Sequence, residues 1–137
     1  VQALDLYRTN YKPSRRYPEP TATICVWALA ANTLADAERL FSSRIHWKLM
    51  REKGELTAID SPEKISKITY SKADMARISE HRKNAIFGTA TSVAKQLTDL
   101  TKAHDIDEIV VLTWTHDHKD RKHSYELLAE AFCLNAH

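Results

Sequence analysis

Histidines and aspartates gather near the C-terminal end of the chain, in the segment THDHKDRKHS. His116, His118 and His123 could ligate a metal, with Asp117 and Asp120 as carboxylate support, because imidazole and carboxylate groups are common metal ligands. A closed site, however, usually has four ligands at characteristic spacing, and His-x-His alone does not meet that requirement. We therefore predict no metal site. Asp117 or Asp120 should instead cap the last helix, and His116 should bind a backbone group.

Ser124 follows in the same segment and, with His116 and Asp117, supplies the residue types of a hydrolytic triad. Nothing places this serine on a strained G-x-S-x-G turn. The chain contains only two glycines, Gly54 and Gly88, so a glycine-rich phosphate loop is also absent from the sequence. A small hydrolase or a metal protein built on this segment is our third hypothesis.

Composition favours a soluble, globular protein of one domain: 137 residues, 43% hydrophobic, 28% charged, with a net charge of +2. The most basic cluster, Lys119, Arg121 and Lys122, is interrupted by aspartates, which predicts a solvated helix face and no nucleic-acid partner. No run approaches the roughly 18 apolar residues of a membrane span, so we expect no membrane partner.

The two cysteines, Cys25 and Cys133, lie in apolar runs, where a free cysteine usually packs as a small hydrophobic residue. Their separation fits neither a metal site nor a disulfide framework. The sequence therefore favours a reducing, cytoplasmic location.

Local patterns in the first half predict a helix stopped at Pro13, then a strand, then a second helix. The run Thr21–Ala31 is almost continuously apolar, which is typical of a parallel strand buried on both faces. Asn32 or Thr33 can cap the following helix, and Lys53-Gly54 should end it.

Residues 55–83 have a weaker pattern and are predicted to form a helical excursion between two regular units. Ser61-Pro62-Glu63 resembles a helix start with proline at its first position. Ser71 and Asp74 resemble a capping box that opens a short helix to about His81.

The second unit begins with a predicted turn at Phe87-Gly88-Thr89 and a helix capped by Thr91 that runs to about Ala103. Glu108–Trp114 should form a second buried strand, and a last helix should run from about Lys119 to Leu134. This alternation implies βαβ units around a parallel sheet. Two strands cannot bury both faces and both edges of such a sheet, so either strands are missed or the chain belongs to something larger.

Two segments resemble the late part of bacterial luciferase-like, flavin-dependent monooxygenases. The first is YKPSRRYPEP followed by a strand ending in ALAANTLADAERL, where Asn32 replaces an aspartate frequent in the family. The second and more specific is the closing block, residues 87–132, with its Gly-Thr, Asp-Glu, His-Asp, Ser-Tyr and Leu-Leu-Ala pairs in family order. The residues that carry this match are Phe87, Gly88, Thr89, Val93, Leu97, Asp107, Glu108, Thr113, His116, Asp117, Arg121, Ser124, Tyr125, Leu127, Leu128 and Ala129.

The resemblance implies an α/β fold, a partial (β/α)8 TIM barrel made of the last two strand-helix units plus the excursion at 55–83. A complete barrel needs about 250 residues, so residues 1–137 would be a C-terminal fragment that is inactive alone. The intact enzyme would use reduced FMN, supplied by a separate flavin reductase, and O2 to oxidise a small organic substrate. The family resemblance also implies a homo-oligomer.

Barrel active sites lie at the carboxyl ends of the strands, here Leu29–Ala31 and Thr113–His116. We predict Thr113 and Trp114 at the rim of the flavin or substrate pocket, because a flat indole can stack on a ring and exclude water. The alternative interpretation is a tryptophan packed between barrel and helices. The alternative function is a free-standing α/β oligomerisation or interaction module without catalytic activity, which pairs its exposed strand edges.

Overall fold

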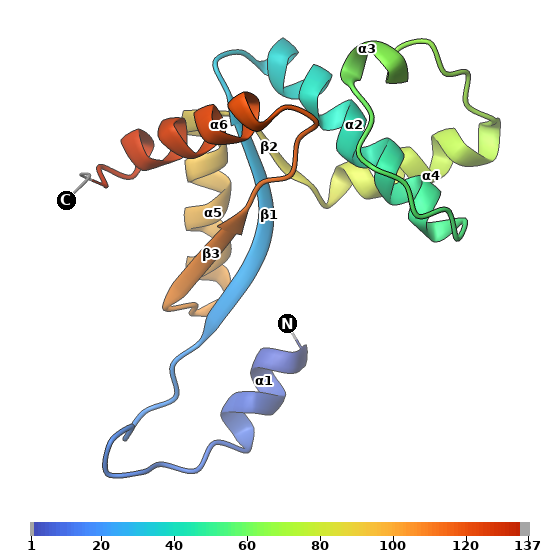
Figure 1. Ribbon diagram of the computed structural model, residues 1–137. Helices are drawn as coiled ribbons and strands as arrows, with labels where there is room; N and C mark the ends of the chain where they lie inside the picture. The colour runs from blue at the N-terminus through green and yellow to red at the C-terminus, as the bar shows by residue number, and fades with distance from the viewer. Residues whose placement is uncertain (1, 135–137) are drawn as a thin grey trace.

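The computed structural model of the protein describes residues 2–134, in which helices and parallel strands alternate (Figure 1). The elements are α1 (Gln2–Thr9), β1 (Thr23–Ala31), α2 (Leu34–Glu52), α3 (Pro62–Ile65), α4 (Lys72–Lys83), β2 (Ile86–Thr89), α5 (Ala90–His104), β3 (Glu108–Leu112) and α6 (His118–Ala131). The α/β class predicted from the sequence is confirmed, with a third strand in addition.

The sheet has the order β2-β1-β3, and both pairings are parallel. β3 pairs with the amino-terminal part of β1, Thr23–Trp27, whereas β2 pairs along the other edge with its carboxyl-terminal part, Ala28–Ala31. The predicted turn at Phe87-Gly88-Thr89 is therefore wrong. This strand of four residues is too short to show an alternating pattern, and its pairing partner lies far away in the sequence.

Helices cover the carboxyl-terminal half of β1 on both faces. Ala28 and Ala30 pack against α5 and α6 through Val93, Leu97 and Leu128. Leu29 and Ala31 point the other way and pack against α2 through Ala37, Leu40, Phe41 and Ile45. Small alanines on β1 let the helices approach closely, and this half of the strand is buried on both faces as predicted.

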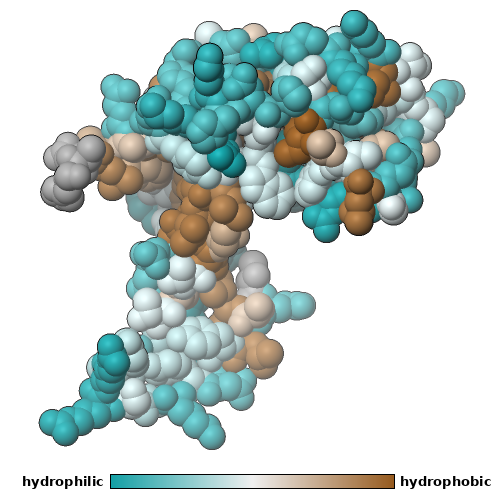
Figure 2. Space-filling view, viewed as in Figure 1, coloured by the Kyte–Doolittle hydropathy of each residue, from teal (hydrophilic) through white to brown (hydrophobic). Residues whose placement is uncertain are grey.

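The amino-terminal half of the sheet has one uncovered face. Cys25 lies beside Val110, and Trp27 beside Leu112, with Val110 45% and Leu112 40% exposed. Burial in β3 alternates, because α5 and α6 cover only the face that carries Ile109. The prediction that both strands are buried on both faces is wrong here, and Figure 2 shows apolar side chains gathered where β1 and β3 run.

The cysteines are exposed, contrary to the prediction that they pack as small hydrophobic residues. Cys25 lies on the uncovered part of β1, and Cys133 follows the end of α6 with a φ of 53°. No helix in the described part of the chain has the length and hydropathy that crossing a membrane requires.

Helix ends follow local capping in most places. Thr33 caps α2, Gly54 follows it with a φ of 85°, and Ser71 caps α4, all as predicted or within the alternatives left open. Thr89 caps α5 in place of the predicted Thr91, because the residues before Ala90 belong to β2.

Two other helix boundaries differ from the predictions. α1 ends at Thr9, before Pro13, where the amide of Asn10 donates to the Leu6 carbonyl. α6 ends at Ala131, short of the predicted Leu134, and its buried residues are Ser124 and Leu128. Tyr125 of α6 and Phe132 just after it are 38% and 40% exposed.

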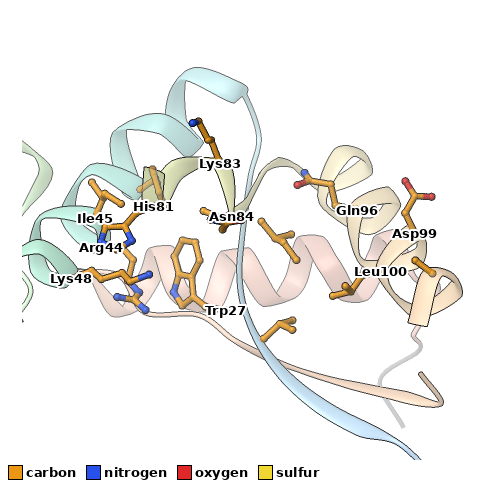
Figure 3. A pocket seen from close by; sticks show the side chains of 15 residues that line it. Trp27, Arg44, Ile45, Lys48, His81, Lys83, Asn84, Gln96, Asp99 and Leu100 are labelled. Carbon is orange, nitrogen blue, oxygen red and sulfur yellow. The ribbon is translucent and has the colours of Figure 1, made fainter. Parts of the chain in front are cut away.

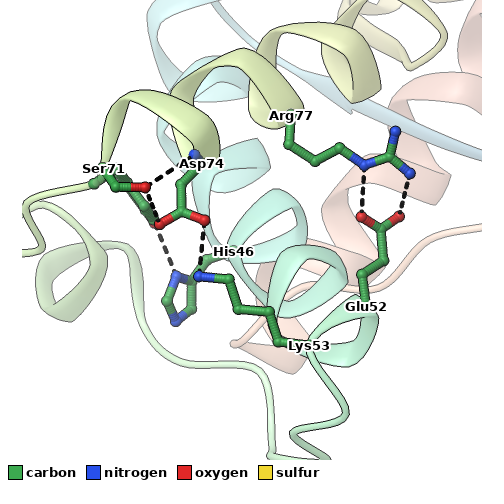
Figure 4. Close-up of polar contacts among 7 residues, drawn as sticks. His46, Glu52, Lys53, Ser71, Asp74 and Arg77 are labelled. Atoms are coloured by element: carbon green, nitrogen blue, oxygen red, sulfur yellow. Dashed lines mark hydrogen bonds and ion pairs between the residues drawn. The ribbon is translucent and has the colours of Figure 1, made fainter.

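Polar contacts join α4 to the end of α2 and so hold the excursion against the sheet-bound helix (Figure 4). Ser71 Oγ accepts from the Asp74 backbone N–H, and the Asp74 carboxylate pairs with Lys53 at 2.7 Å. Glu52 accepts two hydrogen bonds from the Arg77 guanidinium, at 2.8 and 3.2 Å. The predicted capping box at Ser71 is confirmed, and the segment folds as an ordered helical excursion.

The Glu52 carboxylate should make stability depend on acid pH. Its hydrogen bonds to Arg77 and then to His81 lower its pKa from 4.5 to about 2. A depressed folded-state pKa stabilises the protein above the unfolded value, and this stabilisation is lost as pH falls from 4.5 through about 2. Urea unfolding at several pH values should therefore show a smaller acid loss in Glu52→Gln than in the wild type. The exposed Glu130→Gln is the control and should keep the wild-type pH profile; equal profiles for all three proteins would contradict the prediction.

Candidate functional site

All three tryptophans of the chain surround one arginine where α2 crosses the sheet. The Cζ atom of Arg44 lies 5.5 Å from the ring centroid of Trp27, 4.9 Å from that of Trp47 and 4.9 Å from that of Trp114. Trp27 belongs to β1, Trp47 to α2, and Trp114 follows the end of β3. We call these four residues the Arg44–tryptophan cluster.

The apolar face of α2 determines where the cluster forms. Phe41 stacks on Phe87 of β2, with ring centroids 4.1 Å apart and an angle of 8° between the planes, and also contacts Trp27 at 5.8 Å. Arg44 and Trp47 follow at helical spacing, and Arg44 meets Trp27 of β1 and Trp114, which lies beyond β3. Trp47 meets Trp114 edge to face at 5.4 Å, a favourable geometry for aromatic pairs.

Arg44 lies in a setting that disfavours its charge. Burial, and then repulsion from Arg51, lower its pKa below the usual range. Its Nε and Nη1 atoms and the Nε1 atom of Trp27 are buried and have no hydrogen-bond acceptor among residues 2–134. Buried donors are almost always paired in folded proteins, so this grouping is exceptional.

A cavity of about 720 Å³ adjoins the cluster (Figure 3). Arg44, Lys48 and His81 stand on one side, and α5 forms the opposite side with Gln96, Asp99 and Leu100. Between them the cavity follows the edge of β1 at Val26 and Trp27, just before β2 pairing begins at Ala28. The cavity therefore combines cationic side chains with an apolar floor.

Trp114 and Thr113, the two predicted site residues, have different surroundings. Trp114 is 36% exposed and belongs to the cluster. Thr113 is 1% exposed, and its Oγ1 donates to the Ala28 carbonyl at 2.7 Å. β3 ends at Leu112, so both residues lie just beyond the strand that was predicted to contain them. A contact of either residue with a cofactor stays a prediction, and the hydroxyl of Thr113 already has a role within the fold.

The histidines of the THDHKDRKHS segment bind in three different places. Their partners are the Ile59 carbonyl for His116 Nδ1 at 2.8 Å, Arg121 for His118 at 2.8 Å, and Asn32 for His123 at 3.1 Å. Asp117 caps α6 through the Lys119 N–H. The predicted cap at Asp117 and the predicted backbone contact of His116 are both confirmed. Within residues 2–134 no three His, Cys, Asp or Glu side chains converge in a way that could hold a metal ion.

Ser124, His116 and Asp117 do not form the catalytic triad that the hydrolase hypothesis requires. Ser124 is fully buried, and its Oγ accepts from the Ala30 N–H at 2.9 Å. His116 is exposed and bound to the excursion, so the two residues serve different contacts.

Sequence analysis missed Arg44, Trp27 and Trp47. The available indication was the spacing of Arg44, Trp47, Lys48 and Arg51, which repeats at three to four residues on one face of α2. These residues continue the face that Leu40 and Phe41 begin, because Arg44 lies four residues after Leu40 and three after Phe41. The pattern therefore indicated that the buried face of α2 ends in cationic and indole side chains.

Several curated proteins are similar to this chain over nearly its whole length. The chain is 32% identical to a luciferase-like monooxygenase of Escherichia coli K12 over 126 residues, 92% of this chain and 38% of that protein. It is also 35% identical to the uncharacterized protein YceB and 37% identical to the uncharacterized protein YwcH, both of Bacillus subtilis, over 95% and 92% of its length. The chain spans about 38–39% of the length of these curated relatives. No family model matches it.

A solved structure shares the fold. The crystal structure of apo-MsnO8 superposes with a TM-score of 0.81 and 26% sequence identity, over 99% of this chain and 42% of that chain. This chain therefore corresponds to less than half of the MsnO8 chain.

Proposed function

We propose that this chain is the C-terminal part of a luciferase-like monooxygenase that uses reduced FMN and O2 to oxidise an organic substrate. The similarity to the Escherichia coli luciferase-like monooxygenase supports the reaction class. The observation that carries the proposal is the uncovered apolar face in the amino-terminal half of the sheet, which reaches Trp27 and Leu112 beside the Arg44–tryptophan cluster.

The sheet suits one wall of a (β/α)8 barrel. β1 and β3 are parallel neighbours, and α5 and α6 lie on one face only. In such a barrel the helices form an outer ring, and the inner face is filled by side chains from the other strands. Val110 and Leu112 would then point into the barrel, packed by strands of the remaining three fifths of the protein. β2, which lies beside β1 on the other edge, leads from the excursion back into the barrel wall.

The residues present fit a flavin in their chemistry. Barrel active sites lie at the carboxyl ends of the strands, and there Trp114 and Trp47 provide flat apolar surface beside the cationic Arg44. FMN, when bound and reduced, would supply the activation of O2. The role of this chain would be to wall the pocket with indole rings and exclude water, which protects reactive intermediates from side reactions. A separate reductase and a homo-oligomeric enzyme belong to the same proposal.

The test compares the 137-residue chain with the longest product of its gene. We expect the longer product to bind FMN, seen as a change in flavin absorbance, and to consume O2 with chemically reduced FMN. The 137-residue chain alone should show neither activity. Free FMN without protein is the control for non-enzymatic O2 consumption.

The competing hypothesis is an interaction module without catalytic activity. It is favoured by the same exposed residues, because apolar faces and unpaired strand edges promote self-association. A gene that ends with this chain, together with a stable homo-oligomer in light scattering and no flavin binding, would reject the monooxygenase in favour of the module.

A further inference from the structure

The Arg44 guanidinium has donors but no partner of opposite charge among residues 2–134. Its Nε and Nη1 atoms, like the Nε1 atom of Trp27, are buried without an acceptor in the described part of the chain. The charged side chain that acts most on Arg44 is Arg51, which has the same sign. A buried guanidinium normally meets a carboxylate or phosphate, whose oxygens match its fork of N–H groups.

The nearby acidic side chains are engaged elsewhere. Glu52 binds Arg77 and His81, and Asp99, on the far side of the cavity, pairs with Lys95. Lys48 lines the same cavity as Arg44 and adds a second positive charge. The field on this side of the cavity is therefore positive and attracts anions.

Much of the remaining surface of the cavity is apolar, although Lys83, Asn84 and Gln96 also line it. Val26 and Trp27 form its floor, Phe41 and Leu100 extend it, and the three tryptophans enclose the guanidinium itself. A volume of about 720 Å³ is sufficient for a small organic molecule. Donors at one end of an apolar cavity orient a ligand that has one charged end.

We propose that Arg44, with Trp27 and Lys48, binds the oxyanion group of a small apolar ligand, either a carboxylate or a phosphate. Arg44 contacts the oxyanion through its N–H groups, and Lys48 adds long-range attraction. The apolar body of the ligand lies along β1 toward Leu100. This site goes beyond the monooxygenase proposal, because it assigns a ligand class to this chain alone and does not require that flavin binds.

Tryptophan fluorescence provides a direct test, since every tryptophan of the protein contacts Arg44. The 137-residue chain is titrated with sodium phosphate and, separately, with sodium benzoate at constant ionic strength. We expect a saturable fluorescence change with one of them. A response to phosphate alone assigns a phosphate ligand, and a response to benzoate alone assigns a carboxylate.

Variants separate specific binding from general charge. Arg44→Gln should weaken the response about tenfold or more, a loss typical of one charge-assisted contact. Arg44→Lys should weaken the response less than Arg44→Gln, because lysine keeps the positive charge but lacks the paired N–H donors of the guanidinium. Arg15→Gln, which removes an exposed cation that does not line the cavity, is the matched control and should keep wild-type affinity.

Two results would overturn the site. One is the absence of a saturable response to either anion in the folded wild-type chain. The other is an equal response in wild type and Arg44→Gln, with circular dichroism showing that both are folded. Because flavin binding is measured separately by visible absorbance, failure of this site leaves the monooxygenase proposal testable, and the reverse is also true.

Discussion

Phe41→Ala is expected to lower the free energy of unfolding by about 3–5 kcal/mol, the range for removing a buried aromatic ring. Phe41 is 4% exposed and lies between Trp27 of β1 and Phe87 of β2. Its removal would leave a cavity exactly where α2 is attached to the sheet, which the surrounding backbone can fill only in part.

Urea denaturation followed by circular dichroism measures this loss. Phe132→Ala is the matched control, because the same side chain is removed from a position that is 40% exposed. It should cost less than about 1 kcal/mol, as surface substitutions usually do. If both variants lost the same stability, the packing of α2 on the sheet would not depend on Phe41. Phe41→Ala should also shift the tryptophan emission maximum to longer wavelength, toward that of exposed indole, since Trp27 loses a packing partner.

The side chains of Thr113 and Ser124 bind the backbone of β1 where no neighbouring strand pairs with it. β3 stops at Leu112, so the backbone of β1 beyond Trp27 has no strand partner on that edge. Thr113 Oγ1 donates to the Ala28 carbonyl at 2.7 Å, and Ser124 Oγ accepts from the Ala30 N–H at 2.9 Å. Both side chains are fully buried or nearly so, at 1% and 0% exposed.

Ser124→Ala and Thr113→Val should each cost about 1–3 kcal/mol, because each leaves a buried backbone group without its partner. Ser79→Ala, on the exposed side of α4, is the control and should change stability by less than about 0.5 kcal/mol. Hydrogen exchange at the Ala30 amide gives a second measurement, and it should become faster in Ser124→Ala alone. Unchanged exchange at Ala30 would show that the Ser124 hydroxyl does not protect this edge.

The outcome for Thr113 also bears on its predicted place at a cofactor pocket. Its hydroxyl is used within the fold, so Thr113→Val should act on stability more than on any ligand. Trp114 keeps its candidate role, because its ring lies in the Arg44–tryptophan cluster at the carboxyl end of the sheet.

Local chemistry allowed much of the fold to be predicted. Thr33, Ser71 and Asp117 each cap a helix because a short polar side chain can bind the free N–H groups of the next residues. Gly54 follows α2 because it adopts a positive φ without steric cost. Each of these interactions spans only a few residues, so the sequence alone contains what decides it.

Long-range packing decided the rest. β2 forms because residues 86–89 pair with the carboxyl end of β1, some 60 positions earlier in the chain. No local sequence pattern predicts that pairing. The exposure of Cys25 follows from which face of the sheet α5 and α6 cover. Arg44 meets the three tryptophans only because α2 packs on β1 near Trp27 and close to Trp114, which follows β3. The sequence by itself determined the helices, two strands and their α/β order, whereas the tertiary structure decided the sheet order, its uncovered face and the site, because these depend on contacts between residues far apart in the chain.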